Sequence, residues 1–243
     1  MASETHTTKA KPGFYMPTID ISPFLRDPSS SASEEIVKQV REACIGIGFF
    51  QITGHGIPLA LQEAVFAGSA AFFALDMEEK SRLDRSVSVG ASNRGYEVIG
   101  GQGLQKGMLP DLKEAFDIGH EIPATDPRVL ASAYLVGPNL WPPLPSHVFR
   151  DPMSAYFTTM YALSVRVMEL VAATLRDVYA EEEVEGLLSG FVQGGQAVAS
   201  VRLLHYPPGD GKGKLGAGAH TDYGAVTLLL QDGVGGCRSG MIQ

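Results

Sequence analysis

The chain has 243 residues, of which 44% are hydrophobic and 19% are charged, an ordinary globular composition that argues against intrinsic disorder. Nineteen Lys and Arg residues against 27 Asp and Glu residues give a net charge of −8, so we expect no basic surface for nucleic acid. No apolar run is long enough for a membrane span, and the first residues lack the apolar stretch of a secretory signal. The two cysteines, Cys44 and Cys237, lack metal-ligand spacing and favour a reducing, cytoplasmic environment.

The predicted elements begin after a polar lead. Residues 1–15 are rich in Ser, Thr and Lys and predict a disordered segment, and residues 18–21 then predict a short strand. Ser31 and Glu34 have the spacing of a capping box. Apolar residues recur at helical spacing behind them, so we expect an amphipathic helix over residues 33–46.

The next part of the chain predicts one more strand and two more helices. Residues 49–52 predict a strand, Pro58 opens a second helix, and residues 76–80 predict a short polar helix. Residues 86–150 are rich in Gly and Pro, so we expect loops with few strands there.

The C-terminal part predicts a long helix followed by a sheet. Apolar residues recur at helical spacing from residue 152 to about residue 178, and a shorter helix follows over residues 181–188. Residues 197–206 and 225–231 are β-rich and are separated by a loop of Pro, Gly and Lys. Helices first and a sheet late in the chain predict an α+β fold.

The tripeptide His220-Thr221-Asp222 is the main candidate for chemistry. In an extended segment, side chains two residues apart point to the same face, so His220 and Asp222 can reach one ion together. One imidazole and one carboxylate are two of the three ligands in the facial triad that binds non-haem Fe(II). By itself, the tripeptide is more typical of a His–Asp pair that bonds internally at a strand end than of a metal site.

Further motifs stand in a fixed order on both sides of this tripeptide. They are Pro17-Thr18-Ile19-Asp20, Gly48-Phe49-Phe50, Gly54-His55-Gly56-Ile57-Pro58, Phe72-Phe73 with Glu79-Lys80, Arg94-Gly95-Tyr96, Lys113-Glu114 with Phe116, Asn139-Leu140-Trp141-Pro142, Arg202-Leu203-Leu204-His205-Tyr206-Pro207-Pro208 and Thr227-Leu228-Leu229-Leu230. Together they make residues 15–236 resemble the isopenicillin N synthase-like family of 2-oxoglutarate/Fe(II)-dependent dioxygenases. The resemblance implies a helical N-terminal module over residues 16–150. Over residues 151–243 it implies a supporting helix and the first part of a jelly-roll (double-stranded β-helix) core.

The resemblance also implies roles for single residues. His220 and Asp222 would be two metal ligands, and the hydroxyl of Tyr206 would donate to a carboxylate of 2-oxoglutarate. Many relatives have Asn two positions before this Tyr, where the chain has Leu204. Strand alternation turns His205 away from the face of Tyr206, so we expect a structural or surface role for His205.

The reaction and its participants follow from the same resemblance. The loop with Arg94 and Tyr96 would lie near the mouth of the site and contact substrate; the alternative is a packed loop. Fe(II), 2-oxoglutarate, O₂ and, as a further reductant, ascorbate would take part. Oxidative decarboxylation of 2-oxoglutarate would be coupled to hydroxylation, desaturation or ring chemistry on a small organic molecule of specialised metabolism or heterocycle catabolism.

The end of the chain departs from the family pattern. The family continues with a second His and an Arg-x-Ser, but residues 237–243 carry neither, and Arg238-Ser239 lacks the spacer residue. We therefore expect a C-terminally truncated jelly roll with exposed apolar faces, open strand edges and weak iron binding. The rival expectations are a catalytically inert isoform or interaction protein, and an enzyme that takes its missing His from a partner subunit.

Overall fold

The computed structural model describes most of the chain. The described residues are 16–101, 111–191, 197–208, 216–218, 220–222 and 224–234. The expected lead over residues 1–15 and the divergent residues 237–243 lie outside them. The chain divides into two compact units, of which the first includes residues up to 56 together with 169–184, and the second includes residues 57–168 and 185–236.

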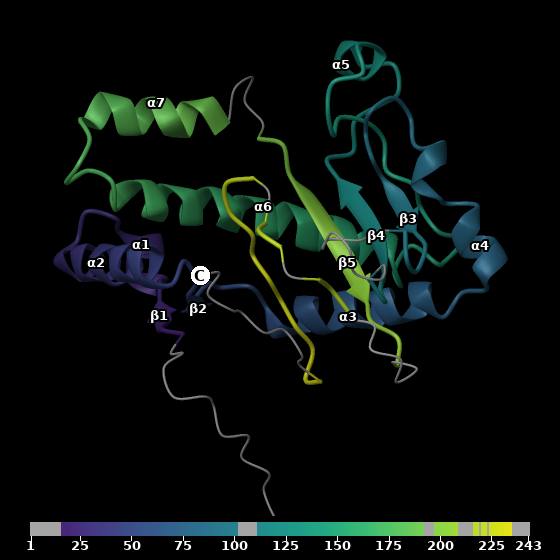
Figure 1. Cartoon of the computed structure of the whole chain (residues 1–243), viewed down its shortest axis with the longest axis horizontal. Coiled ribbons are helices and arrows are strands. Elements are labelled where there is room, and N and C mark those ends of the chain that lie inside the picture. Colours follow the sequence, from purple (N-terminus) through teal and green to yellow (C-terminus); the bar gives the residue numbers. More distant parts are fainter. Residues whose placement is uncertain are drawn as a thin grey trace, which may run out of the picture. The chain divides into compact units, whose positions relative to one another are not determined.

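The first unit contains a small parallel sheet and two helices that lie between its strands in the chain (Figure 1). Its elements are β1 (Thr18–Asp20), α1 (Ser22–Arg26), α2 (Ser31–Gly46) and β2 (Gln51–Thr53). β1 pairs with β2 in parallel, with Ile19 opposite Ile52. Ile36, Val40 and Ala43 of α2 are buried, which confirms the amphipathic helix predicted from the sequence.

The N-cap of α2 differs by one residue from the predicted one. Ser30, not Ser31, is the cap, and its hydroxyl oxygen accepts the backbone N–H of Ser33 at 3.3 Å. Ser30 has the extended backbone that an N-cap requires, whereas Ser31 is already helical. The Ser33 hydroxyl donates to the carbonyl oxygen of Asp27 at 2.6 Å, so the first turn is tied to the preceding loop.

The second unit contains most of the remaining helices. They are α3 (Leu59–Phe73), α4 (Met77–Ser81), the short 3₁₀ helix η1 (Arg85–Val87) and α5 (Pro127–Leu130), while α6 (Arg150–Ala173) and α7 (Glu181–Phe191) belong partly to each unit. α6 is the predicted long helix, but it ends at Ala173 rather than near residue 178. Its end coincides with side-chain bonds to main-chain carbonyls. The Thr174 hydroxyl donates to the carbonyl of Val171 at 2.6 Å, and Arg41 donates to the carbonyl of Thr174 at 2.6 Å.

An antiparallel sheet forms the centre of the second unit. It consists of β3 (Gly95–Glu97), β4 (Glu114–Gly119) and β5 (Ser200–His205), in that order. The described part of residues 86–150 has few strands, as expected, but the sequence did not indicate the two that form, β3 and β4. All six residues of β4 are buried, so its sequence lacks the alternation by which a half-exposed strand is recognised. β5 lies within the β-rich segment 197–206, as predicted.

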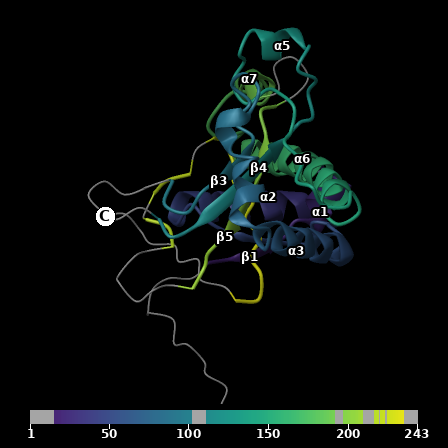
Figure 2. The same ribbon diagram turned by 90° about the vertical axis from the view of Figure 1, so that its right-hand side faces the viewer.

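Aromatic side chains fill the space between this sheet and its helices. The ring of Phe72 in α3 lies 4.3 Å from the ring of Phe116 in β4 and 5.6 Å from the ring of Phe149, centroid to centroid. All three side chains are fully or almost fully buried. α3 and α6 lie on the same side of the sheet (Figure 2). Each ring pair contributes about 0.5–1.5 kcal/mol beyond its buried area, so these rings hold the sheet against the helices.

The second predicted C-terminal strand does not form. Residues 224–234 contain no strand, which corrects the expectation for residues 225–231. Leu229 and Leu230 are 63% and 39% exposed. An apolar segment becomes a strand only when its backbone groups find a partner strand, and none of the described strands pairs with this one. β5 likewise pairs only with β4 within the described part of the chain.

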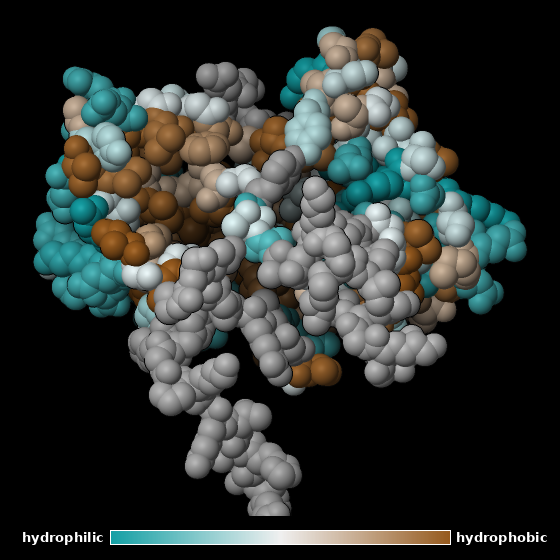
Figure 3. Space-filling model, in the orientation of Figure 1, coloured by the Kyte–Doolittle hydropathy of each residue, from teal (hydrophilic) through white to brown (hydrophobic). Residues whose placement is uncertain are grey.

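The fold is thus the predicted α+β arrangement, a helical N-terminal module followed by an incomplete jelly-roll sheet that α6 supports. On the face in view in Figure 3, apolar surface is exposed mainly over α6 and α7. Among the helices that the structure describes, none combines the length and the apolar character of a membrane span.

Candidate functional site

His220 and Asp222 approach each other across Thr221. Nε2 of His220 lies 3.5 Å from Oδ1 of Asp222. Bonds of about 2.0–2.2 Å from a divalent metal to nitrogen and oxygen can bridge up to roughly 4.3 Å, so one ion can contact both atoms. The two side chains are 38% and 54% exposed, which leaves them open to a ligand from solvent. The structure therefore brings the two predicted metal-site residues together, although residues 220–222 are not part of a strand.

The other ring nitrogen of His220 has a partner that fixes the ring. Nδ1 lies 2.7 Å from the carbonyl oxygen of Gly218. Because a carbonyl oxygen only accepts, Nδ1 carries the proton, and Nε2 of the neutral ring keeps its lone pair. Histidines that bind metals usually donate their second N–H in this way. The nitrogen that can bind a metal is therefore the one beside Asp222.

Gly218 is itself held by a buried carboxylate from a distant part of the chain. Its N–H donates to Oδ1 of Asp111 at 2.9 Å, and Nζ of Lys113 donates to Oδ2 of Asp111 at 2.9 Å. The Asp111 and Lys113 side chains are 3% and 7% exposed. Asp111 was not among the residues predicted from the sequence. Its only sequence signal is an acidic residue two positions before a lysine at the start of a buried strand.

Tyr206 lies directly after β5 and is 47% exposed. Leu204 is 37% exposed, whereas Leu203 on the alternate face is buried, so Leu204 and Tyr206, two residues apart, share the open face. Gly216 packs against the Tyr206 ring so closely that a Cβ at this position would lie 2.8 Å from Cδ1 of the ring. Backbone therefore covers one side of the ring.

His205 lies on the opposite face, as alternation predicts, and its side chain contacts protein groups there. Its Nδ1 is 2.8 Å from Oε1 of Glu114, and its ring packs 5.3 Å from the Phe73 ring. Oε2 of Glu114 accepts Nζ of Lys80 at 2.9 Å and the hydroxyl of Tyr96 at 2.5 Å. Burial raises the pKa of Glu114, but the hydrogen bonds from Tyr96, His205 and Lys80 outweigh it and hold this pKa below its ordinary value.

A second ionic cluster lies on the other face of β4. Oδ2 of Asp117 accepts Nη2 of Arg85 at 2.6 Å and Nη1 of Arg202 at 3.1 Å, and Glu97 pairs with both guanidinium groups. Burial raises the pKa of Asp117 more than the two arginines lower it. The cluster joins η1 and all three strands of the sheet, and so it fixes β5, at whose end Tyr206 lies.

Arg94 and Tyr96, the predicted substrate contacts, lie in the core. Arg94 is fully buried and donates to the carbonyl oxygens of Ser92 at 2.9 Å and Leu135 at 2.8 Å. Tyr96 is 1% exposed, and its hydroxyl bonds to Glu114. This environment is that of the packed-loop alternative, and it lends no support to a contact between substrate and either side chain.

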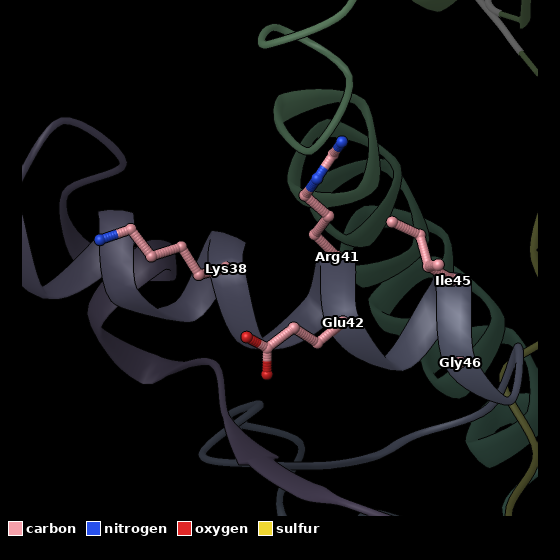
Figure 4. Close-up of a pocket in the computed structure, with 5 residues that line it drawn as sticks. All are labelled: Lys38, Arg41, Glu42, Ile45 and Gly46. Atoms are coloured by element: carbon pink, nitrogen blue, oxygen red, sulfur yellow. The ribbon is translucent and has the colours of Figure 1, made fainter.

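Within the described ranges, no third His, Cys, Asp or Glu joins His220 and Asp222 in a metal-binding group. A pocket of about 410 Å³ lies on α2 in the first unit and is lined by Lys38, Arg41, Glu42, Ile45 and Gly46 (Figure 4). Its polar side chains point in different directions rather than converging. A binding site needs convergent polar groups, so this pocket is not a candidate.

The chain is similar in sequence to a family of non-haem dioxygenases and to several curated proteins. A family model described as "non-haem dioxygenase in morphine synthesis N-terminal" matches residues 16–144, more than half of the chain. The 2-oxoglutarate-dependent dioxygenase citB of Monascus ruber is 46% identical over 230 residues, which are 91% of this chain and 66% of that protein. Clavatol oxidase claD of Penicillium crustosum is 41% identical over 240 residues, 92% of this chain and 68% of that protein.

A solved structure agrees with these relatives. The crystal structure of full-length Neurospora crassa T7H in complex with alpha-KG and thymine superimposes with a TM-score of 0.65 at 28% identity, covering 89% of this chain and 64% of that one. The chain thus spans about two thirds of the length of the curated relatives that it matches. The agreement of motifs, fold and relatives over nine tenths of the sequence places the chain in the non-haem 2-oxoglutarate-dependent dioxygenase family.

Proposed function

We propose that this chain provides part of the metal and cosubstrate site of an Fe(II)/2-oxoglutarate-dependent oxidoreductase that acts on a small organic molecule. In a hydroxylation of this class, one atom of O₂ enters the substrate and the other enters succinate, while 2-oxoglutarate loses CO₂. Because the chain covers 66% of the length of citB, the activity is proposed from the site and the family together.

The geometry of His220 and Asp222 is the observation that carries this proposal. Their Nε2 and Oδ1 atoms lie 3.5 Å apart, and the Gly218 carbonyl keeps the proton on Nδ1. A neutral imidazole and a carboxylate are the N and O donors that suit non-haem Fe(II). Bound there, Fe(II) would supply the activation of O₂. The two side chains would hold the ion, and the Gly218 carbonyl would keep the ring oriented toward it.

Tyr206 is the proposed partner of the cosubstrate. Its hydroxyl can donate to a carboxylate, and the residue lies on the open face at the end of β5. Leu204 on the same face adds an apolar side chain where many relatives have Asn, so this chain offers one polar contact fewer. We expect Tyr206→Phe to raise the Kd for 2-oxoglutarate without changing metal affinity, which separate titrations of the two ligands would measure.

Metal titration of single variants tests the proposed ligands. Mn(II), which is stable in air, is titrated into the chain, and free Mn(II) is followed by electron paramagnetic resonance. His220→Ala and Asp222→Ala should each abolish most of the binding. His147→Ala is the matched control, because His147 is an exposed histidine of the second unit. Equal binding by all three variants and the unchanged chain would contradict the proposal.

Turnover separates an active enzyme from the inert alternative. The chain is incubated anaerobically with Fe(II) and 2-oxoglutarate, O₂ is added, and succinate is measured with and without candidate small-molecule substrates. Succinate that disappears in His220→Ala supports the proposed activity. Metal binding without any succinate would instead favour the inert isoform. Succinate that forms only after a second protein is added would favour a ligand supplied by a partner subunit.

A further inference from the structure

We propose that Asp111, held in place by Lys113, is a positioning residue that orients the imidazole of His220 for metal binding. The proposal rests on the proposed function, since it concerns the orientation of one of the proposed ligands. It adds a role for a buried ion pair that lies 107 residues away in the chain from the glycine that it holds.

Asp111 and Lys113 form a buried ion pair. The Asp111 and Lys113 side chains are 3% and 7% exposed, and Nζ of Lys113 donates to Oδ2 of Asp111 at 2.9 Å. A buried carboxylate needs a positive partner and further hydrogen bonds to remain ionised. Lys113 supplies the charge and occupies Oδ2, which leaves Oδ1 to accept from another donor.

The Asp111 carboxylate accepts a hydrogen bond from the backbone N–H of Gly218. Gly218 is buried, and its N–H donates to Oδ1 of Asp111 at 2.9 Å. A buried N–H without an acceptor is costly, and a bond to an ionised carboxylate is among the stronger hydrogen bonds in proteins. Asp111 therefore fixes the position of Gly218 against the residues that lead into β4.

Gly218 in turn contacts the imidazole of His220. The carbonyl oxygen of Gly218 accepts the proton on Nδ1 of His220 at 2.7 Å. Gly218 is thus bonded from both sides, by Asp111 at its N–H and by His220 at its carbonyl. If Asp111 no longer held the N–H, the carbonyl could turn away, and His220 would lose both its fixed ring plane and its fixed tautomer. Since His220 and Asp222 are well exposed, little else would restrain them.

The chain provides a matched control for a substitution at Asp111. Asp126 also accepts a backbone N–H, that of Arg128, at 2.9 Å. It also pairs with a basic side chain two residues later, that of Arg128, at 3.0 Å. Asp126 caps the short helix α5 and has no bond to the segment of His220 in the described contacts. Asp111→Ala and Asp126→Ala therefore remove the same pattern of bonds, a buried one at Asp111 and a more exposed one at Asp126.

The test compares Mn(II) affinity by electron paramagnetic resonance in the unchanged chain, Asp111→Ala, Asp111→Asn and Asp126→Ala. We expect Asp111→Ala to weaken binding by at most roughly 10- to 100-fold, the loss usual for a direct partner of a metal-binding histidine, because Asp111 acts on His220 through Gly218. Asp111→Asn keeps an oxygen acceptor for Gly218 and should restore part of this loss. Asp126→Ala should bind as the unchanged chain does. Equal affinity of Asp111→Ala and Asp126→Ala would overturn the proposal.

Nitrogen-15 spectra of the imidazole provide a readout that a general loss of stability would not change. The unchanged chain should show His220 protonated at Nδ1 and a coupling across the hydrogen bond between the Gly218 amide and the Asp111 carboxyl group. Asp111→Ala should show a mixture of both His220 tautomers. The absence of the coupling in the unchanged chain would overturn the proposal even if Asp111→Ala failed to fold.

The two proposals fail in different ways. If His220→Ala binds Mn(II) as tightly as the unchanged chain, then the proposed ligand is wrong. If His220→Ala loses binding while Asp111→Ala keeps both affinity and tautomer, then His220 is a ligand and only the positioning role of Asp111 is wrong.

Discussion

Three side chains converge on the buried carboxylate of Glu114. Lys80, Tyr96 and His205 reach it from α4, β3 and β5, and the Glu114 side chain is 3% exposed. Replacing Glu114 with Ala leaves the ammonium of Lys80 buried without its carboxylate. We expect Glu114→Ala to lower the free energy of unfolding by roughly 3–5 kcal/mol, measured by urea denaturation.

The exposed pair of Glu78 and Arg82 is the control for this prediction. Their side chains are 79% and 70% exposed and lie four residues apart on the chain. Exposed pairs of this kind contribute at most about 1 kcal/mol, because water screens them. If Glu78→Ala and Glu114→Ala lowered the free energy of unfolding by similar amounts, burial would not add to the stabilising effect of the Glu114 cluster.

His120 gives the protein a pH-dependent stability. Its ring packs 4.8 Å from the rings of both Phe157 and Tyr161, and burial lowers the pKa of His120, with Arg94 and Arg128 lowering it further. The unfolded chain therefore takes up this proton at a higher pH than the folded chain. The contribution of neutral His120 to the free energy of unfolding is complete above pH 6.5, the ordinary pKa of histidine. It is lost as the pH falls through the lower pKa of His120 in the folded chain.

His120→Phe keeps an aromatic ring in this position and removes the titrating group. Between pH 7.5 and 5.5, the free energy of unfolding of the unchanged chain should therefore fall more steeply than that of His120→Phe. Urea denaturation at several pH values would measure both curves. Parallel curves for the two proteins would show that the proton on His120 does not affect folding.

At the scale of the element, the start of α2 depends on one hydroxyl. Ser30 caps the helix through the N–H of Ser33, although the sequence spacing had indicated Ser31. We expect Ser30→Ala to lower the free energy of unfolding by about 1 kcal/mol. Ser31→Ala, one residue inside the helix, should change it far less, because alanine favours helices. If Ser31→Ala lowered the free energy of unfolding more than Ser30→Ala in thermal or urea denaturation, Ser31 would be the N-cap.

Elements with a repeating pattern could be predicted from the sequence, and those without one could not. α2, α3 and α6 have apolar residues at helical spacing, and β5 lies within a β-rich segment. β4 has neither pattern because both of its faces are buried. Residues 225–231 carry a strand-like sequence, yet no described strand pairs with them. A pattern predicts which face an element buries, but pairing depends on a neighbour elsewhere in the chain.

At the scale of the whole molecule, several large apolar side chains of the described residues remain exposed, among them Leu204, Leu229 and Leu230. In the described part of the chain, β5 has β4 on one side and no strand on the other, and Leu204 on its open face is 37% exposed. Open edges and apolar faces favour association between copies. We expect the average mass in sedimentation velocity to rise with protein concentration, despite the net charge of −8.

Leu204→Lys should reduce this association, because a lysine on the open strand costs desolvation when copies pair there. Leu59→Lys is the control, since Leu59 is 68% exposed but begins α3 rather than lying on the sheet. An equal reduction by both variants would mean that added charge, not the strand, controls association. A constant mass at all concentrations would contradict the prediction directly.

The sequence by itself determined the family, the helical module and the tripeptide that brings His220 beside Asp222, because these depend on local spacing and on motif order. The cytoplasmic location remains a prediction from cysteine usage. Only the tertiary structure decided that Asp111 bonds to Gly218 and that Arg94 and Tyr96 are buried. Contacts between residues that are distant in the chain depend on how strands and loops pack, and a pattern of neighbouring residues contains no information on that packing.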